Sequence, residues 1–268
     1  MSQVIAVTNQ KGGVGKTTTA VNLASALAER GYRVLAIDLD PQGNATTALG
    51  TEKHGLERHC YHVLMGGVPI EQVARPTEIP SLRVLPSSID LTGAELELVS
   101  VMARETRLRQ ALASVRSDYD FVFIDCPPSL GLLTINALTA ADSILVPLQC
   151  EYYALEGLSS LLNTVDLVRG SLNPKLRVGG VLLTMFDRRN RLSFQVEADV
   201  RQHFSDLVYA TAIPRNVRLS ESPSFGKPIL LYSRTCPGAL AYGRVADELL
   251  GREDAWAHPN QILTREVA

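Results

Sequence analysis

Two lysines and three glycines near the N-terminus have the types and spacing of a phosphate-binding loop. Residues 9–18 read N-Q-K-G-G-V-G-K-T-T. Glycine lets backbone N–H groups turn inward around phosphate oxygens, because no Cβ obstructs the turn. A lysine after the last glycine suits the β- and γ-phosphates of a nucleotide, and the next hydroxyl suits Mg²⁺. The expected nucleotide-binding residues are Gly12, Gly13, Val14, Gly15, Lys16, Thr17 and Thr18, with Thr17 also on Mg²⁺.

Three aspartates follow short apolar runs that are typical of buried strands. Asp38 ends the run R-V-L-A-I-D, Asp40 comes two residues later, and Asp125 ends F-V-F-I-D. In an open parallel sheet, ligands gather at the carboxyl ends of the strands. Asp125 fits a carboxylate that holds a magnesium-bound water opposite Thr17. For Asp38 and Asp40, the alternative is a capping pair at a strand-to-helix turn.

Positive charge is concentrated in the third quarter of the chain. Residues 169–244 contain 12 Lys/Arg and 5 Asp/Glu, whereas the whole chain has a net charge of −2. Clustered arginines suit contacts with a phosphate backbone, which carry no base specificity. The alternative is a solvated loop with scattered arginines, and charge alone does not separate the two. The candidate DNA-binding residues follow two expected strands and are Arg188, Arg189, Arg191, Arg215 and Arg218.

These residues need a framework of strands and helices that alternate along the chain. Helical periodicity follows the glycine loop and ends at Gly31, and later strands are expected at 82–85, 121–125, 143–147, 178–185 and 208–213. Helices are expected at 132–140, 154–169, 193–204 and 238–250, and at 95–115, whose apolar stripe is expected to lie in the core. The alternation predicts an α/β fold with one doubly wound, mostly parallel sheet. We expect a single domain over 1–250 and a C-terminal tail over 251–268.

Composition limits the class of protein. The 268 residues are 46% hydrophobic and 20% charged, which is ordinary for a soluble globular chain with a sizeable core. The longest apolar runs have the length of strands, so no transmembrane helix is expected, and a cytoplasmic location is the default. In the tail, acids outnumber bases and Pro259 interrupts any helix, which disfavours membrane targeting.

The glycine loop departs from the general G-x-x-x-x-G-K-[ST] pattern. Gln10 stands where the first glycine is expected, and an additional lysine, Lys11, begins the glycine run. This K-G-G-x-G-K-T-T form resembles the deviant Walker A motif of the ParA/MinD family of P-loop ATPases. With D-L-D-P-Q-G-N-A-T and I-D-C-P-P-S-L, the chain resembles chromosomal ParA (Soj-type) partition ATPases over nearly its whole length.

The resemblance implies specific roles for the candidate residues. Asp40 would position or activate the attacking water, and Asp38 would support Mg²⁺ through its water shell. Lys11 would act with Lys16 in catalysis by reaching the phosphates of a second subunit, and Gly12 would allow the two loops to approach closely. Pro214 and Asn216, after the last expected strand, complete the expected nucleotide-binding residues.

The same resemblance predicts partners. ATP binding would drive a sandwich homodimer that binds double-stranded DNA non-specifically on the nucleoid, with Arg189 and Arg218 as the best matches to the family's arginines. A ParB-type centromere-binding protein would stimulate hydrolysis. The alternatives are a MinD-like membrane cycle, which the tail disfavours, and a metabolic P-loop enzyme, which has little use for the arginines. A DNA-binding module without ATPase activity does not explain the Walker motifs.

Overall fold

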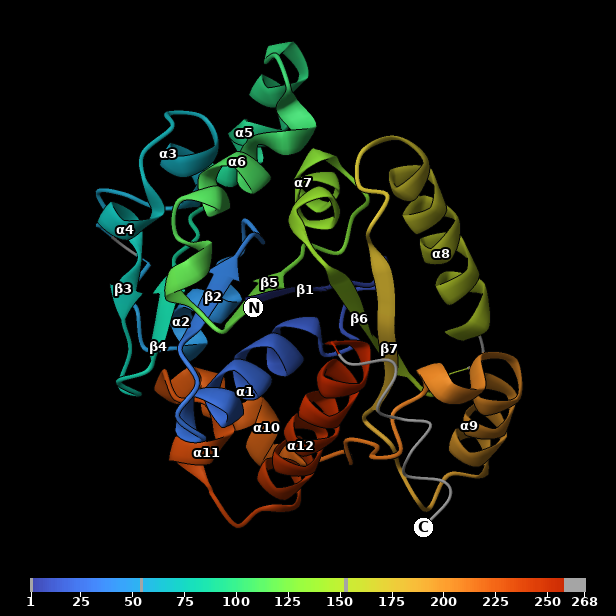
Figure 1. Cartoon of the computed structure of the whole chain (residues 1–268). Coiled ribbons are helices and arrows are strands. Elements are labelled where there is room, and N and C mark those ends of the chain that lie inside the picture. The colour runs from blue at the N-terminus through green and yellow to red at the C-terminus, as the bar shows by residue number, and fades with distance from the viewer. Residues whose placement is uncertain (1, 54, 152–153, 258–268) are drawn as a thin grey trace.

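A central β-sheet organises the molecule (Figure 1). The computed structural model describes residues 2–53, 55–151 and 154–257. Its named strands are β1 Gln3–Val7, β2 Val34–Asp38, β3 Arg75–Pro76, β4 Leu82–Leu85, β5 Phe121–Asp125, β6 Ser143–Gln149 and β7 Arg177–Thr184. They lie in the order β3-β4-β2-β5-β1-β6-β7. Neighbouring strands are parallel except β3 and β4, which confirms the predicted α/β fold with a mostly parallel sheet.

Helices cover both faces of this sheet (Figure 1). The longer helices are α1 Lys16–Glu29, α7 Leu132–Ala140, α8 Ala154–Ser171, α9 Arg191–Phe204 and α12 Pro237–Ala257. The shorter ones are α2 Asn44–Ala48, α3 Cys60–Leu64, α4 Ile70–Val73, α5 Leu91–Glu97, α6 Arg107–Ala113, α10 Val217–Glu221 and α11 Ile229–Tyr232. None of the helices in the described ranges is both long enough and apolar enough to cross a membrane.

The pleat of the strands divides the interior into two cores. Along β1, Val4 and Ala6 point into one core, with α6, α7 and α8, while Ile5 and Val7 point into the other, with α1, α11 and α12. Successive side chains of a strand face opposite sides of the sheet, so a central strand covered on both faces is apolar throughout. This explains why the continuous apolar runs of the sequence predicted β1, β2 and β5 correctly.

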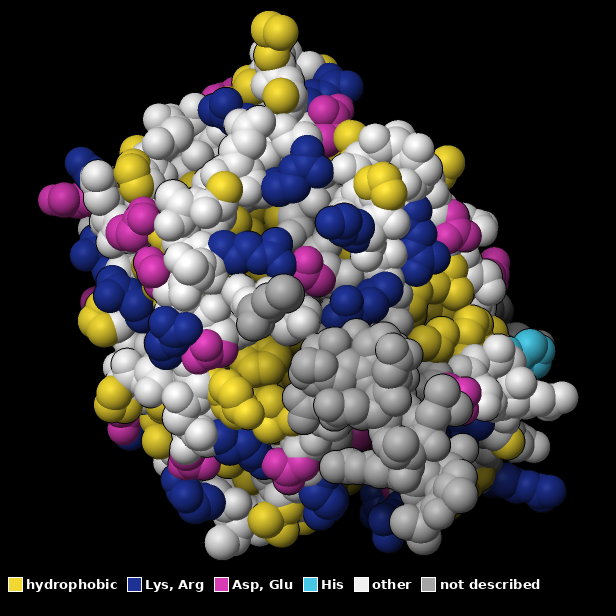
Figure 2. All heavy atoms as spheres, in the orientation of Figure 1, with side chains coloured by type: hydrophobic (Ala, Val, Ile, Leu, Met, Phe, Trp, Pro, Cys, Tyr) yellow, Lys and Arg dark blue, Asp and Glu magenta, His cyan; other side chains and the backbone are white. Residues whose placement is uncertain are grey.

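The prediction of one helix over 95–115 is wrong. The chain there forms α5, two short 3₁₀ turns at Leu98–Ser100 and Arg104–Thr106, and then α6. Ala103 interrupts the path with a left-handed φ of 55°. Leu96 and Met102, expected in the core, are 77% and 90% exposed. Figure 2 shows hydrophobic side chains on the uppermost projection of the molecule, over the segment between α5 and α6 in Figure 1.

Two further expectations need correction. Residues 208–213 are not a regular strand, although they run parallel to β7. An isolated bridge pairs Val208 with Val181, and the Tyr209 and Ile213 N–H groups donate to carbonyls of β7 at 2.9 and 2.8 Å. The N–H groups of Ala210 and Thr211 bond to the Glu248 carboxylate instead of a strand. The last helix also continues beyond the expected end at residue 250, to Ala257. Pro259 and most of the expected tail lie outside the described residues.

Candidate nucleotide site and arginine surface

The glycine loop has the backbone of a phosphate-binding turn. Gly13 and Gly15 adopt left-handed φ values of 76° and 89°, which favour glycine. Helix α1 then begins at Lys16, so its free N–H groups and positive dipole end face the loop. The Lys16 ammonium donates to the Lys11 carbonyl at 3.0 Å and is 7% exposed. Burial lowers the pKa of Lys16, whereas nearby Asp125 and Asp40 act to raise it.

Contacts from neighbouring strands hold this loop in place. The Asn9 amide donates to the Pro147 carbonyl of β6 at 2.8 Å, and its side-chain oxygen accepts from the Lys11 N–H at 3.0 Å. The Thr184 hydroxyl, at the end of β7, donates to the Val14 carbonyl at 2.8 Å. The loop is therefore attached to the carboxyl ends of three adjacent strands, β1, β6 and β7.

The sheet register brings the predicted carboxylates to the same edge. Asp125 lies opposite Val7 of β1 on one side and Asp38 of β2 on the other. Asp125 is 1% exposed, and its two carboxylate oxygens have no hydrogen-bond partner among the described residues. Burial, followed by the charges of Asp38 and Asp40, raises the pKa of Asp125, although the nearby Thr17 side chain and the charge of Lys16 oppose the rise. A buried carboxylate in this state fits a bound cation, because the cation would offset the cost of burying the charge.

Asp38 and Asp40 differ in what they bind. One Asp38 oxygen accepts from both the N–H and the hydroxyl of Thr46, each at 2.7 Å, and the other faces the Asp40 N–H at 3.3 Å. The Asp40 carboxylate accepts from the Gln42 N–H at 2.9 Å. Burial raises the pKa of Asp38, although the bonds from Thr46 oppose the rise. Asp38 thus binds the first turn of α2 through Thr46, whereas the Asp40 contact with Gln42 lies in the turn before that helix.

The additional lysine is engaged within its own chain. The Lys11 ammonium forms an ion pair with Glu151, which lies two residues beyond β6, and the two side chains are 44% and 46% exposed. The neighbouring Gly12 is not crowded, since a Cβ there would meet only Pro128, at 3.9 Å. Nothing within the described chain therefore requires glycine at position 12.

Pro214 and Asn216 lie beside the end of β7. Pro214 bridges Phe186, two residues beyond Thr184, which contacts the loop. The Asn216 side chain caps α10 by accepting from the Arg218 N–H at 3.0 Å. The structure thus gives Asn216 a capping role, and its expected contact with nucleotide stays a prediction.

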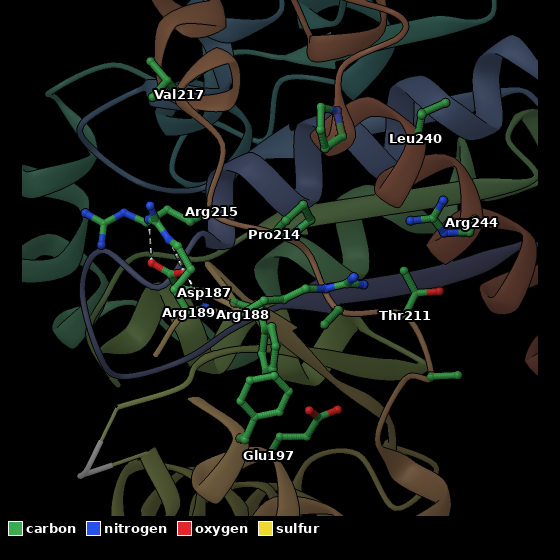
Figure 3. A pocket seen from close by; sticks show the side chains of 15 residues that line it. Asp187, Arg188, Arg189, Glu197, Thr211, Pro214, Arg215, Val217, Leu240 and Arg244 are labelled. Carbon is green, nitrogen blue, oxygen red and sulfur yellow. Dashed lines mark hydrogen bonds and ion pairs between the residues drawn. The ribbon is translucent and has the colours of Figure 1, made fainter. Parts of the chain in front are cut away.

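Three of the five candidate DNA-binding arginines surround one cavity, which we call the arginine hollow. It has a volume of about 1350 Å³ and lies between α9, the residues after β7 and α12. The arginines that line it are Arg188, Arg189, Arg215 and, from α12, Arg244. Figure 3 shows the dashed contacts between Arg189 and Asp187, with Arg244 on the opposite side of the hollow. Hydrogen bonds from Arg189 lower the pKa of Asp187 to about 2, so this acid is ionised among the arginines.

Arg191 and Arg218 are not part of the hollow's lining. Arg191 begins α9, and Arg218 lies in the first turn of α10, where it pairs with Glu221 at 3.2 Å. Both are exposed, as are the three predicted arginines of the hollow. The five arginines therefore lie in the two segments that follow β7 and Pro214, and they do not form a single cluster.

Sequence reasoning missed several residues of this region. Glu151 and Thr184 are polar residues at the ends of strands. The same signal identified the aspartates, so these two residues could have been found in the same way. Thr46 and Ser87 form contacts between segments that are far apart in the sequence. Arg244 lies on a helix for which periodicity indicated only packing.

Comparison with known proteins places these motifs in a family. A family model described as an AAA domain matches residues 2–178. The chromosome partitioning protein ParA of Caulobacter vibrioides is 56% identical over 253 residues, covering 94% of this chain and 95% of that protein. The sporulation initiation inhibitor protein Soj of Bacillus subtilis is 56% identical over 249 residues, covering 93% and 98%.

Solved structures agree on the architecture. A Mycobacterium smegmatis protein named cobyrinic acid a,c-diamide synthase, solved with ADP and magnesium, superposes with a TM-score of 0.85 at 41% identity, covering 97% of each chain. The septum site-determining protein MinD of Pyrococcus horikoshii, complexed with Mg-ADP, has a TM-score of 0.77 at 25% identity, covering 93% of this chain and 96% of that one.

Proposed function

The chain belongs to the ParA/Soj family of P-loop ATPases, and we propose that it is a DNA-partitioning ATPase that uses ATP with Mg²⁺ to control its hold on DNA. Its relatives named for chromosome partitioning span nearly its whole length. The observation that carries the proposal is that a phosphate-binding loop with an additional lysine and a surface of exposed arginines occur on the same edge of one sheet.

For hydrolysis, each residue of the strand-end site has a proposed task. The loop N–H groups and Lys16 bind the phosphates, and Thr17 and Asp125 hold Mg²⁺, with Asp38 supporting its water shell. Mg²⁺ would neutralise charge that develops on the transferred phosphoryl group. Asp40 orients the attacking water, because its carboxylate belongs to a loop that faces the same site. Burial of Lys16 and Asp125 favours this arrangement, since charges interact more strongly away from water.

For switching, we propose a homodimer in which ATP is held between two copies. Lys11 would leave Glu151 and reach the phosphates of the second subunit. The open space at Gly12 supports this proposal, because the described chain does not itself explain a glycine there. A side chain at position 12 would then obstruct the approach of the second loop.

For DNA, we propose that the dimer binds the phosphate backbone through Arg188, Arg189, Arg191, Arg215 and Arg218, assisted by Arg244. These contacts carry no sequence preference, so the protein would associate with the nucleoid at large. A ParB-type centromere-binding partner would stimulate hydrolysis and release the DNA. We propose that residues 1–250 form one ATPase domain for this cycle and that 251–268 act as a tail.

DNA co-sedimentation with and without ATP tests this function. We expect the wild type to pellet with DNA when ATP is present and poorly without it. Arg189→Glu should abolish pelleting while light scattering still detects ATP-driven dimers. The matched control is Lys175→Glu, which makes the same charge change on an exposed residue just before β7, at the opposite end of that strand. Equal pelleting with and without nucleotide would refute the proposal. So would loss of pelleting in Lys175→Glu while Arg189→Glu still pellets.

A metabolic activity is the second candidate, because a solved relative is named a cobyrinic acid diamide synthase. That relative is 41% identical to this chain, whereas the partitioning relatives are 56% identical. A metabolic enzyme would release ADP in response to a small-molecule substrate. Release that responds only to a ParB-type protein and DNA would favour partitioning.

A further inference from the structure

The turn that follows β4 contacts the Asp40 loop directly. β4 pairs with β2, so Ser87, two residues beyond β4, lies beside the residues that follow β2. Ser87 and Thr46 are both fully buried, at 0% exposure. Neither belongs to the predicted phosphate-binding loop or to the predicted metal ligands.

Hydrogen bonds join these two residues to both aspartates. The Ser87 hydroxyl donates to the Asp40 carbonyl at 2.6 Å, and the Ser87 N–H donates to the Thr46 hydroxyl oxygen at 2.9 Å. The Thr46 hydroxyl in turn donates its one hydrogen to Asp38 at 2.7 Å. Asp38 and the Asp40 main chain are therefore connected through two buried hydroxyl groups.

The Asp40 carbonyl accepts a second hydrogen bond, which comes from within its own turn. The Gly43 N–H bonds to the same carbonyl at 2.9 Å and closes the local turn, with Gly43 in a left-handed conformation at a φ of 61°. Without the Ser87 hydroxyl, this turn keeps its own hydrogen bond but loses the direct hydrogen bond between the Asp40 main chain and the turn after β4. The loop would stay folded while the direction of the Asp40 carboxylate became less fixed.

We propose that Ser87 and Thr46 are positioning residues for ATP hydrolysis, which together fix the main chain of Asp40 against the sheet. The inference rests on the proposed role of Asp40 in orienting water. Water attack requires the reacting groups to be held in alignment, and a displacement of about 1 Å can cost roughly 100-fold in rate. A residue that fixes Asp40 should therefore affect turnover more than nucleotide binding.

The first test compares two serines in the same turn. The Ser88 hydroxyl lies 3.2 Å from His59 Nε2 and accepts from the Asp90 N–H, so Ser88→Ala removes an equal group that does not touch Asp40. We expect Ser87→Ala to lower the single-turnover hydrolysis rate roughly tenfold, with the Kd for ADP within about twofold of wild type. Ser88→Ala should keep the wild-type rate. Equal rates for Ser87→Ala and wild type, or equal losses of rate and ADP affinity, would overturn the inference.

A second pair of variants excludes a general loss of folding. Thr46→Val preserves the size of the side chain but removes its hydroxyl, whereas Thr46→Ser keeps the hydroxyl. We expect hydrolysis to fall in Thr46→Val and to remain near wild type in Thr46→Ser, and a slow Thr46→Ser variant would count against positioning. Asp40→Ala distinguishes failure of the proposed role of Asp40 from failure of the positioning role. If Asp40→Ala still hydrolyses ATP, the proposed role of Asp40 fails; if it is inactive while Ser87→Ala and Thr46→Val are unaffected, only this inference fails.

Discussion

At the scale of single residues, Lys11 has one partner in its own chain and a different one in the proposed dimer. Its ion pair with Glu151 leaves both side chains nearly half exposed. Exposed pairs of this kind contribute about 0–1 kcal/mol. Breaking the pair is therefore a small cost against binding the triphosphate of a second subunit.

Substitutions at the two residues of this ion pair should have opposite effects on dimer formation. Glu151→Gln should let dimers form at a lower ATP concentration, by up to about fivefold, because Lys11 no longer has to leave a carboxylate. Lys11→Ala should bind nucleotide and remain a monomer, because the contact across the dimer is lost. Light scattering over a series of ATP concentrations measures both. A Glu151→Gln protein that needs more ATP, or a Lys11→Ala protein that dimerises normally, would contradict the proposed exchange of partners.

The residues that the sequence predicted well are those whose partners are close in the chain or fixed by the sheet register. The glycine loop is contiguous, and Asp38 and Asp125 are the last residues of two strands that pair with each other. Ser87 meets Asp40 across 47 residues, and Glu151 meets Lys11 across 140. A polar residue at a strand end can mark Glu151 as a candidate, but no local pattern identifies its partner, because that depends on how the strands are ordered in the sheet.

At the scale of elements, strands were predicted more accurately than the segment between β4 and β5. Both β4 and β5 match the predicted ranges, and β5 is apolar up to Asp125 because both of its faces are covered. Over 95–115, the apolar residues repeat as in a helix, but the chain turns at Ala103 and only part of the stripe reaches the core. Leu98 and Leu108 are buried, whereas Met102 projects into solvent.

Stability measurements should distinguish the two sides of this segment. Leu98→Ala should lower the free energy of unfolding by about 2–5 kcal/mol, because a fully buried side chain leaves a cavity. Met102→Ser should change it by no more than about 0.5 kcal/mol, because Met102 is 90% exposed. Urea denaturation followed by circular dichroism gives both values. A large loss in Met102→Ser would show that this segment packs as the sequence predicted.

At the scale of the whole molecule, the net charge of −2 conceals an uneven distribution. Five arginines proposed to bind DNA lie after β7 and the bridges that follow it, and Arg244 faces Arg188 across the arginine hollow. The carboxylates of Asp187 and Glu197 also line the hollow and would repel phosphate. One protomer therefore offers a modest site, and we expect tight binding to DNA to need the proposed dimer.

Salt dependence would reveal how many copies engage DNA. Affinity for duplex DNA falls with salt with a logarithmic slope of about −0.9 for each neutralised phosphate, because counterions are released. If each protomer engages the same arginines, the slope for the ATP-bound wild type should be about twice that of Lys11→Ala with ATP, which keeps the arginines but not the dimer. Fluorescence anisotropy with a labelled duplex at several salt concentrations measures both slopes.

Arg218→Glu should reduce the slope measured for the ATP-bound dimer, whereas Lys175→Glu should leave it unchanged. Equal slopes for the wild type and Lys11→Ala would mean that a single protomer makes all the phosphate contacts, and that dimerisation does not control binding to DNA.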